Sequence, residues 1–302
     1  MQRPDRNSAP SESPAAPSDD GLIRNVSDTA RLVAVDRAVE SERPDALFRD
    51  PFARRLAGER GARIAESNPL GARKNAAGWP IVTRTYVIDQ MIQAHIAQGG
   101  DMVINLAAGL DTRPYRMELP RSLQWIEVDL PEILAHKEEI LRGEEPVCSL
   151  ERVRLDLSDV PARRELFARL GRQSHKALVI SEGLVVYLSS DEAALLAQDL
   201  AAQPGFHSWI LDMVSPKLLA TLQKRMTTNL KEAAPFKFAP AQGPAFFAKF
   251  GWNVVEANSL LRVAARLNRL PFYLVPISWF PDSHGTQPQR PWGGVCLFSR
   301  TN

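Results

Sequence analysis

A loop of small residues and an acidic side chain follow two successive apolar runs near the middle of the chain. Met102–Leu106 leads into the loop Ala107–Asp111, and Leu123–Val128 ends at Asp129, 20 residues after Gly109. Small residues let the backbone approach a ligand closely, and glycine permits a sharp turn. A carboxylate at such a strand end can accept hydrogen bonds from both ribose hydroxyls. The spacing therefore predicts a nucleoside site, although this turn also occurs in α/β proteins that bind no nucleoside.

The glycine pattern of the loop distinguishes between the two commonest nucleoside cofactors. A dinucleotide site needs three glycines, spaced G-x-G-x-x-G, so that a pyrophosphate can lie at a helix N-terminus. Only Gly109 is present here, and Asp111 follows it where an anion would be unwelcome. A cofactor without phosphate suits this loop better, which favours S-adenosylmethionine over NAD.

A parallel sheet would bring these loops together, because its strands carry ligand-binding loops at their carboxyl ends. Seven short apolar runs are typical of strands: Met102–Leu106, Leu123–Val128, Val153–Leu155, Leu178–Ile180, His207–Met213, Trp252–Glu256 and Gly294–Phe298. Helical patterns alternate with several of them, one starting at Pro131 and another at a capping box of Ser189 and Glu192. The alternation predicts an α/β fold with a doubly wound, mostly parallel, seven-stranded sheet.

The chain divides by composition and pattern. Residues 1–21 are rich in Pro, Ser, Ala and Asp and lack the apolar region of a secretory signal, so we expect a disordered tail. The remainder, residues 22–302, is expected to form one domain. Its predicted parts are a helical N-terminal layer (22–98), a cofactor-binding core (99–214), an inserted lid (215–250) and the C-terminal strands (251–302).

Overall composition limits the possible partners. The formal charge of +2 gives no reason to expect nucleic acid, and no apolar run is long enough for a membrane span. Cys148 and Cys296 are too few for a disulfide framework or a thiolate metal site, so we expect no metal and a cytoplasmic location. Oligomeric state is left open.

Several motifs together resemble the leucine carboxyl methyltransferase family, in its bacterial, polyketide-type branch. They are Val103–Arg113, Glu127–Pro131, Leu155–Leu157 and Ser181–Leu188, with Ser27–Arg31 and Leu47–Ala53 upstream. The resemblance implies a Rossmann-like methyltransferase fold with S-adenosylmethionine as cofactor. This family usually has glycine where the chain has Ala107, and the extra methyl group could narrow the approach to the methionine portion of the cofactor.

The resemblance also implies a role for each matching polar residue. Asp129 would hold the ribose, Asp156 and the Leu157 backbone the adenine, Glu182 the methionine amino group, and Arg84, or less directly Arg31, the methionine carboxylate. Each has a plain structural alternative. Asp156 could cap the turn at Ser158, Glu182 could be a strand-end carboxylate, and both arginines could be solvated helix charges.

The sequence indicates less about the acceptor of the methyl group than about the cofactor. A carboxylate needs no general base, whereas a hydroxyl gains from one, usually histidine. None of the five histidines (His95, His136, His175, His207 and His284) lies in a motif that marks it as a base, so no catalytic residue is assigned. Four aromatic side chains of the predicted lid could form an apolar substrate pocket or ordinary core: Phe236, Phe238, Phe246 and Phe247.

These observations predict an O-methyltransferase that acts on a carboxylate or hydroxyl of a small molecule of secondary-metabolite type. A protein C-terminal carboxylate is the main competing acceptor. The sequence also leaves room for an NAD(P)-dependent oxidoreductase, and for a protein that binds S-adenosylmethionine without turning it over.

Overall fold

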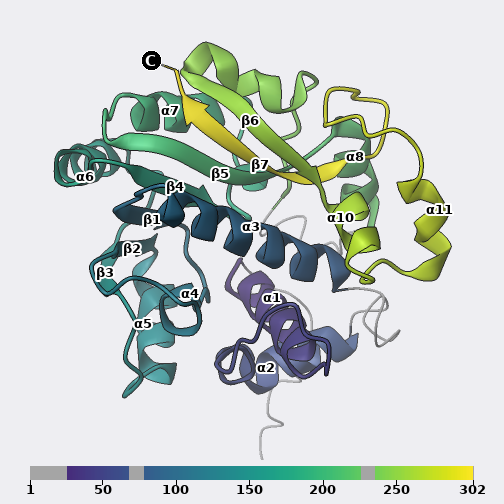
Figure 1. Ribbon diagram of the computed structural model, residues 1–302, viewed down its shortest axis with the longest axis horizontal. Helices are drawn as coiled ribbons and strands as arrows, with labels where there is room; N and C mark the ends of the chain where they lie inside the picture. Colours follow the sequence, from purple (N-terminus) through teal and green to yellow (C-terminus); the bar gives the residue numbers. More distant parts are fainter. Residues whose placement is uncertain (1–25, 68–77, 226–234, 302) are drawn as a thin grey trace, which may run out of the picture.

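The structure is a computed structural model, and it describes residues 26–67, 78–225 and 235–301. The predicted tail, residues 1–21, lies outside this part of the chain. A seven-stranded sheet in the order β3-β2-β1-β4-β5-β7-β6 forms the centre (Figure 1). Its strands are β1 (Met102–Leu106), β2 (Gln124–Asp129), β3 (Ser149–Arg154), β4 (Ala177–Ser181), β5 (Phe206–Val214), β6 (Trp252–Ser259) and β7 (Gly293–Arg300).

The pairing of the strands makes the sheet mixed but mostly parallel. β1 to β5 pair in parallel with one another, whereas β7 runs antiparallel to both β5 and β6. Every residue of β1 and β4 is buried, as expected for strands that are covered on both faces. The predicted α/β fold with its seven strands is therefore confirmed.

Helices connect and cover the strands. They are α1 (Val26–Ser41), α2 (Ala53–Ser67), α3 (Trp79–Ala97), α4 (Arg113–Arg116), α5 (Pro131–Ile140), α6 (Val160–Gln173), η1 (Val185–Tyr187), α7 (Ser190–Ala201), α8 (Pro216–Arg225), η2 (Gly243–Phe250), α10 (Leu260–Arg266), η3 (Phe272–Leu274) and α11 (Val275–Ser278). Pro131 is the first residue of α5, and the capping box predicted at Ser189 begins α7.

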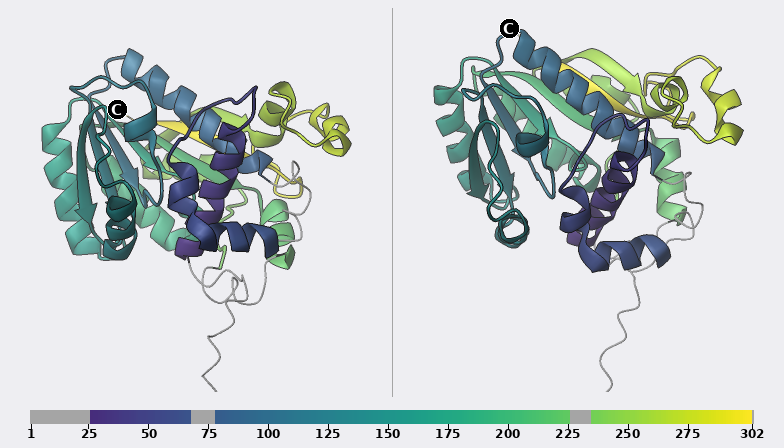
Figure 2. Two further views of the ribbon diagram at one scale, coloured as in Figure 1. Left: turned by 90° about the horizontal axis from the view of Figure 1, so that it is seen from below. Right: turned by 60° about the horizontal axis from the view of Figure 1, so that its bottom comes forward.

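Two apolar layers hold the helices on the sheet. On one face, α3 and α10 pack over β1, β4 and β5 through residues such as Ile88 and Val263. On the other face, α6, α7 and η2 pack through residues such as Phe167, Leu196 and Phe247. The views in Figure 2 show helices on both sides of the sheet. The sheet is thus doubly wound.

The two N-terminal helices form a separate pair beside α3 (Figure 1). Ala34 of α1 and Leu56 of α2 share a small apolar cluster with Leu110, which belongs to the loop after β1. The N-terminal layer is therefore anchored on the loop that the sequence assigns to the cofactor.

The segment predicted as a lid divides into two parts with different surroundings, and residues 226–234 lie outside the described ones. α8 faces a large cavity through Leu218 and Leu222. η2 instead contributes Phe247 to the core, where its ring packs on Trp209. Between α10 and β7, residues 267–292 form a long excursion that includes η3 and α11. No strand or helix pattern in the sequence had indicated it.

No helix of the described residues is long and apolar enough to cross a lipid bilayer.

Candidate cofactor and substrate site

A cavity of about 1290 Å³ opens at the carboxyl ends of β1, β2, β4 and β5. This edge of the sheet is where open α/β folds bind ligands, at the point where the strand order reverses. The polar side chains that line the cavity near these strand ends come from the strands, the loop after β1, α1 and α3: Thr29, Arg37, Arg84, Asn105, Asp111, Asp129, Glu182 and Asp212.

Asp129 closes the loop after β1. Its Oδ2 accepts a hydrogen bond from the Gly109 N–H at 2.6 Å, and its Oδ1 accepts one from the Leu130 N–H at 2.7 Å. Burial raises the pKa of Asp129, and these two N–H donors oppose that shift. Because each carboxylate oxygen can accept more than one hydrogen bond, both remain able to receive a ribose hydroxyl. The residues present therefore fit the nucleoside part of the cofactor.

The backbone of this loop explains the unusual alanine. Ala107 and Gly109 both adopt the left-handed conformation, with φ of 53° and 50°. A side chain in that conformation costs roughly 1–2 kcal/mol, which glycine avoids. The departure at Ala107 therefore strains the backbone of the loop, in addition to the narrowing expected from its methyl group.

A buried group of hydrogen bonds between Arg37, Asp50 and Thr112, called the clasp below, holds the same loop against the N-terminal layer. Arg37 donates to Asp50 Oδ2 at 2.9 Å and to the Leu110 carbonyl, and Thr112 Oγ1 donates to the same Asp50 oxygen at 2.7 Å. Arg37 is 7% exposed, Asp50 2% and Thr112 0%. Asp50 belongs to the upstream motif Leu47–Ala53, so this motif holds the cofactor loop although it lies far from it in sequence.

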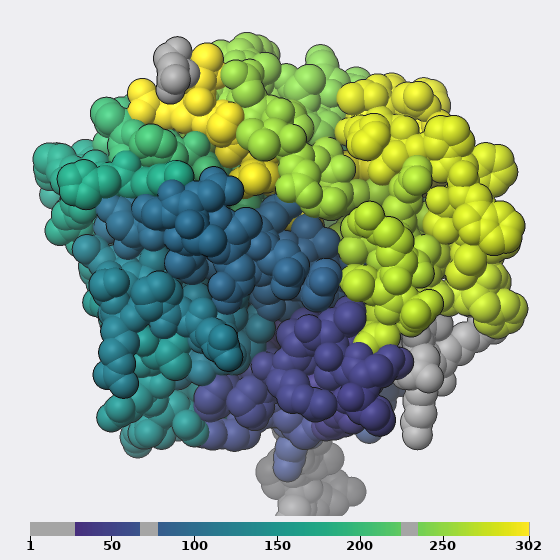
Figure 3. Space-filling model, viewed as in Figure 1, coloured from purple at the N-terminus to yellow at the C-terminus, as the bar shows by residue number. Residues whose placement is uncertain are grey.

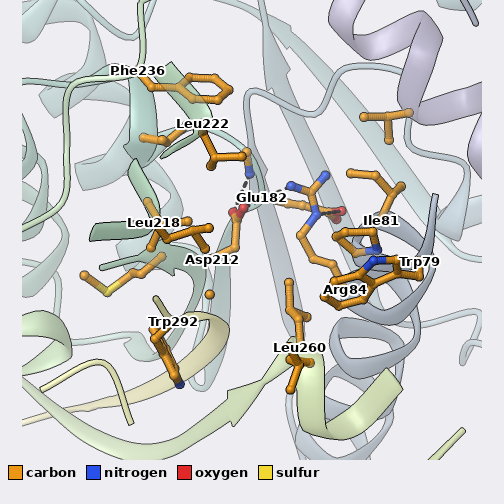
Figure 4. Close-up of a pocket in the computed structure, with 18 of the residues that line it drawn as sticks. Trp79, Ile81, Arg84, Glu182, Asp212, Leu218, Leu222, Phe236, Leu260 and Trp292 are labelled. Atoms are coloured by element: carbon orange, nitrogen blue, oxygen red, sulfur yellow. Dashed lines mark hydrogen bonds and ion pairs between the residues drawn. The ribbon is translucent and has the colours of Figure 1, made fainter. Parts of the chain in front are cut away.

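Glu182, at the end of β4, lies between two arginines. Arg84 Nε donates to its Oε1 at 2.8 Å, and Arg113 Nη1 donates to its Oε2 at 2.9 Å. Arg84 also donates to Asp212 Oδ2 at 2.9 Å, as Figure 4 shows. Asp212, on β5, accepts a second hydrogen bond from the Gly183 N–H at 2.6 Å. No local sequence pattern marks Asp212, because its partners come from α3 and from the turn after β4.

Further charged side chains lie behind the cavity wall and pair with those that line it. Arg113 donates to Asp111 Oδ2 at 2.7 Å and to Asp89 Oδ1 at 2.6 Å, and Arg116 also pairs with Asp89. Asn105 holds Asp111 by donating to its Oδ2.

This cluster has a net negative charge. Three arginines (Arg84, Arg113 and Arg116) pair with four carboxylates (Asp89, Asp111, Glu182 and Asp212), which leaves one negative charge in excess. A cationic sulfonium with an ammonium group nearby fits such a wall.

Three residues that the sequence assigns to the cofactor do not line the cavity. Asp156 is exposed and accepts a hydrogen bond from the Ser158 N–H at 2.8 Å, which is the capping alternative. Leu157 packs against the core beneath the sheet. Arg31 donates from Nη1 to the carbonyls of α2 residues Leu56 and Ala57, and its contact with the methionine carboxylate stays a prediction. The adenine contacts of Asp156 and Leu157 stay a prediction.

Only two of the four aromatic residues of the predicted lid line the cavity. Phe236 and Phe238 line the cavity, and Tyr187 lies beside them with its ring centroid 5.3 Å from that of Phe236. Phe246 and Phe247 pack elsewhere, against Phe238 and the core. Half of the expected aromatic pocket is therefore ordinary core.

The part of the cavity beyond Arg84 and Asp212 is mainly apolar. Figure 4 shows Leu218, Leu222 and Phe236 on one side and Trp79, Ile81 and Leu260 on the other, with Trp292 nearby. Residues of the excursion between α10 and β7 complete this wall, and the sequence had given no sign of them: Tyr273, Leu274, Ile277, Phe280 and Pro281. Their short helical turns have no periodicity that could have revealed them.

Comparison with known proteins identifies the family. The sequence profile of the leucine carboxyl methyltransferase family matches residues 30–201. The chain belongs to this family. The recognition made from the sequence is thereby confirmed, together with the methyltransferase class and S-adenosylmethionine as the cofactor. The NAD(P)-dependent alternative is excluded.

One relative matches nearly the whole chain, and another matches little more than half of it. A protein of Streptomyces avermitilis is 34% identical over 291 residues, which cover 90% of this chain and 95% of the relative. A protein of Streptomyces coelicolor is 35% identical over 184 residues, which cover 58% of this chain and 64% of the relative. Both are described as candidate S-adenosyl-L-methionine-dependent methyltransferases.

Solved structures share the fold at low sequence identity. A DUF574 family protein of Streptomyces avermitilis matches with a TM-score of 0.52 and 14% identity, over 91% of this chain and 97% of that one. A candidate methyltransferase of Thermobifida fusca matches with a TM-score of 0.51 and 17% identity, over 90% and 94%.

Proposed function

We propose that this methyltransferase transfers a methyl group to an oxygen of a small molecule, and that the oxygen belongs to a carboxylate. The observation that carries the proposal is a single cavity that extends from Asp129 and Gly109 to a mainly apolar half lined by Leu222, Phe236 and Leu260. Its volume of about 1290 Å³ exceeds the roughly 300–1,000 Å³ typical of a site for one small ligand. The cavity therefore has room for the cofactor and a small acceptor together.

The proton-accepting groups of the cavity favour a carboxylate over a hydroxyl acceptor. All five histidines belong to the described residues, and none of them lines the cavity. Burial opposes ionisation of Asp111 and Glu182, but Arg113 holds the pKa of each below its usual value. Asp111 and Glu182 are therefore weak bases toward a neutral hydroxyl. Asp129, whose pKa is raised by burial, is the proposed acceptor for the ribose hydroxyls. A carboxylic acid is already ionised near neutral pH and needs no base.

The roles of the chain's residues follow from their positions. Asp129 would hold the ribose, and the Arg84–Glu182–Asp212 group would meet the charged methionine portion. The cofactor supplies a methyl group on a cationic sulfur, in a site that positions the acceptor and excludes water. The acceptor oxygen would take this methyl group, and the electron pair of the S–CH₃ bond would remain on sulfur. A carboxylate and a sulfonium thus give two neutral products, with no proton released.

The test compares acceptors that share one carbon skeleton. Purified protein is incubated with S-adenosylmethionine and an arylalkanoic acid, the corresponding alcohol or the corresponding phenol, and S-adenosylhomocysteine and methylated product are measured by mass spectrometry. We expect the acid to be methylated at a rate that changes little between about pH 6 and 9. Turnover of the phenol alone, rising with pH, would show that the acceptor is a hydroxyl.

A short peptide with a free C-terminal leucine tests the alternative of a protein substrate. Its C-terminal amide serves as the matched control, because it lacks only the acceptor carboxylate. Preference for the peptide acid over every small acid would assign the activity to protein C-termini.

A further inference from the structure

We infer that the acceptor is a lipophilic carboxylic acid whose apolar body fills the half of the cavity beyond Arg84 and extends out along residues 272–280. The inference rests on the proposed function and specifies its substrate class. It also assigns the excursion between α10 and β7 as the entrance of the substrate.

The walls of this half-cavity present hydrocarbon surface from several elements. Leu218 and Leu222 of α8 lie with Phe236 on one side, and Leu260 and Ile81 lie opposite them (Figure 4). Burial between these walls increases the affinity for an apolar group by up to about fourfold for each methylene. An acyl chain or a fused aromatic system therefore suits this space better than a polar acceptor.

The apolar lining continues onto the outer surface. Tyr273, Ile277 and Phe280 line the cavity, yet they are 51%, 52% and 62% exposed. Phe272 and Trp279 beside them are 85% and 77% exposed. Five large apolar side chains are thus exposed within nine residues. A patch of exposed large apolar side chains such as this one usually marks a binding site on a folded protein.

The position of the patch matches that of an entrance. Residues of this segment (yellow-green) project at one end of the molecule in Figures 1 and 2 and form its right-hand edge in the space-filling view of Figure 3. Because the same side chains contact both the cavity and solvent, an apolar ligand can remain in contact with hydrocarbon from the surface to the interior. This continuity favours the substrate over a separate partner as the molecule that covers the patch.

The charged side chains at the entrance suit a substrate that carries a carboxylate. Arg262 lines the cavity, is exposed, and donates to the Phe280 carbonyl at 3.4 Å, which ties α10 to the segment. Arg290 also lines the cavity and donates to Gln287 Oε1. Asp282, the acidic residue here, accepts from the His284 N–H at 2.9 Å. Two cations and one anion at the opening leave a net positive charge, which attracts an anionic acid as it enters and before its carboxylate reaches the interior.

The experiment measures binding of hexanoate, octanoate and decanoate to the full chain in the presence of S-adenosylhomocysteine, by isothermal titration below their micelle concentrations. We expect the affinity to increase by about two- to fourfold for each added methylene. The double variant Ile277→Ser/Phe280→Ser should weaken decanoate binding by roughly tenfold and flatten the dependence on chain length. Val255→Ser is the control, because Val255 is 61% exposed on β6 and does not line the cavity.

The outcomes separate this inference from the proposed function. Affinity that does not depend on chain length would overturn the inference, even if short acids are methylated. Binding that increases with chain length without methylation of any acid would overturn the proposed function instead. If the double variant changes only the sedimentation behaviour, the patch joins two copies of the chain and the inference is wrong. Thermal unfolding of each variant verifies that it is folded.

Discussion

The Arg84 Nε donates a hydrogen bond to Glu182 Oε1 at 2.8 Å and so joins α3 to the end of β4 across 98 positions of the sequence. The other oxygen of Glu182 accepts from Arg113, so one carboxylate is held by two cations from separate elements. Without its charge, the cluster of three arginines and four carboxylates would lose its excess negative charge beside the site that receives a cationic cofactor.

The substitution Glu182→Gln should therefore weaken S-adenosylmethionine binding by about tenfold or more, because a buried negative charge beside the cofactor is lost. Titration calorimetry measures the dissociation constant. Glu144→Gln provides the matched control, since Glu144 pairs with Arg55 at the surface. Equal affinities in the two variants would show that Glu182 does not act on the cofactor.

The clasp between Asp50 and Thr112 predicts an effect at a distance from the ligand. Thr112→Val keeps the shape of the side chain but removes the hydrogen bond to Asp50, which we expect to cost about 1–3 kcal/mol of stability. The loosened loop should also bind S-adenosylhomocysteine more weakly. Urea unfolding and titration measure the two effects, with Thr301→Val, exposed at the end of β7, as control. A loss of stability with unchanged affinity would separate the clasp from cofactor binding.

A buried ion pair supports β2 below Asp129. Glu127 and Lys137 have fully buried side chains with Oε1 and Nζ 2.7 Å apart, and Arg152 contacts the other carboxylate oxygen. Glu127→Ala leaves the Lys137 charge buried with its partner removed, so we expect a loss of about 3–5 kcal/mol in the free energy of unfolding. Glu138→Ala removes a partly exposed carboxylate that pairs with Arg154 and lies 3.9 Å from Arg152 Nη1, and it should cost less than about 1 kcal/mol. Similar losses in both variants would contradict this account.

Asp36 makes stability depend on pH. Burial raises its pKa from 3.8 to about 7, against the opposing effect of Arg37 and Arg84. The unfolded chain therefore loses this proton at lower pH than the folded chain does. The contribution of Asp36 to stability falls as pH rises from about 4 to about 7, and it stays low above that range.

We accordingly expect Asp36→Asn to raise the melting temperature at pH 8 more than at pH 5. The exposed Asp191→Asn serves as control. The same shift at both pH values would mean that Asp36 ionises normally in the folded protein.

The parts of the fold that were predictable are those with a local cause. Apolar runs ending in Gly109 and Asp129 predicted two adjacent parallel strands, and the structure brings these residues within hydrogen-bonding distance. The capping box at Ser189 was equally local.

Contacts between distant residues could not be predicted in this way. Asp212 depends on Arg84 from α3, and Arg37 depends on Asp50 and on a carbonyl after β1. The entrance at Tyr273 to Phe280 consists of short turns without a periodic pattern. Only tertiary packing places these groups at the cavity.

The most direct test of the central claim is the dissociation constant of S-adenosylhomocysteine for Asp129→Ala, measured by titration calorimetry beside Asp191→Ala. Asp129 anchors the Gly109 loop and is the proposed acceptor for the ribose hydroxyls. Its loss should weaken binding by at least about a hundredfold, with cooperative thermal unfolding retained and the control unchanged. Wild-type affinity in folded Asp129→Ala protein would contradict the placement of the cofactor at this loop.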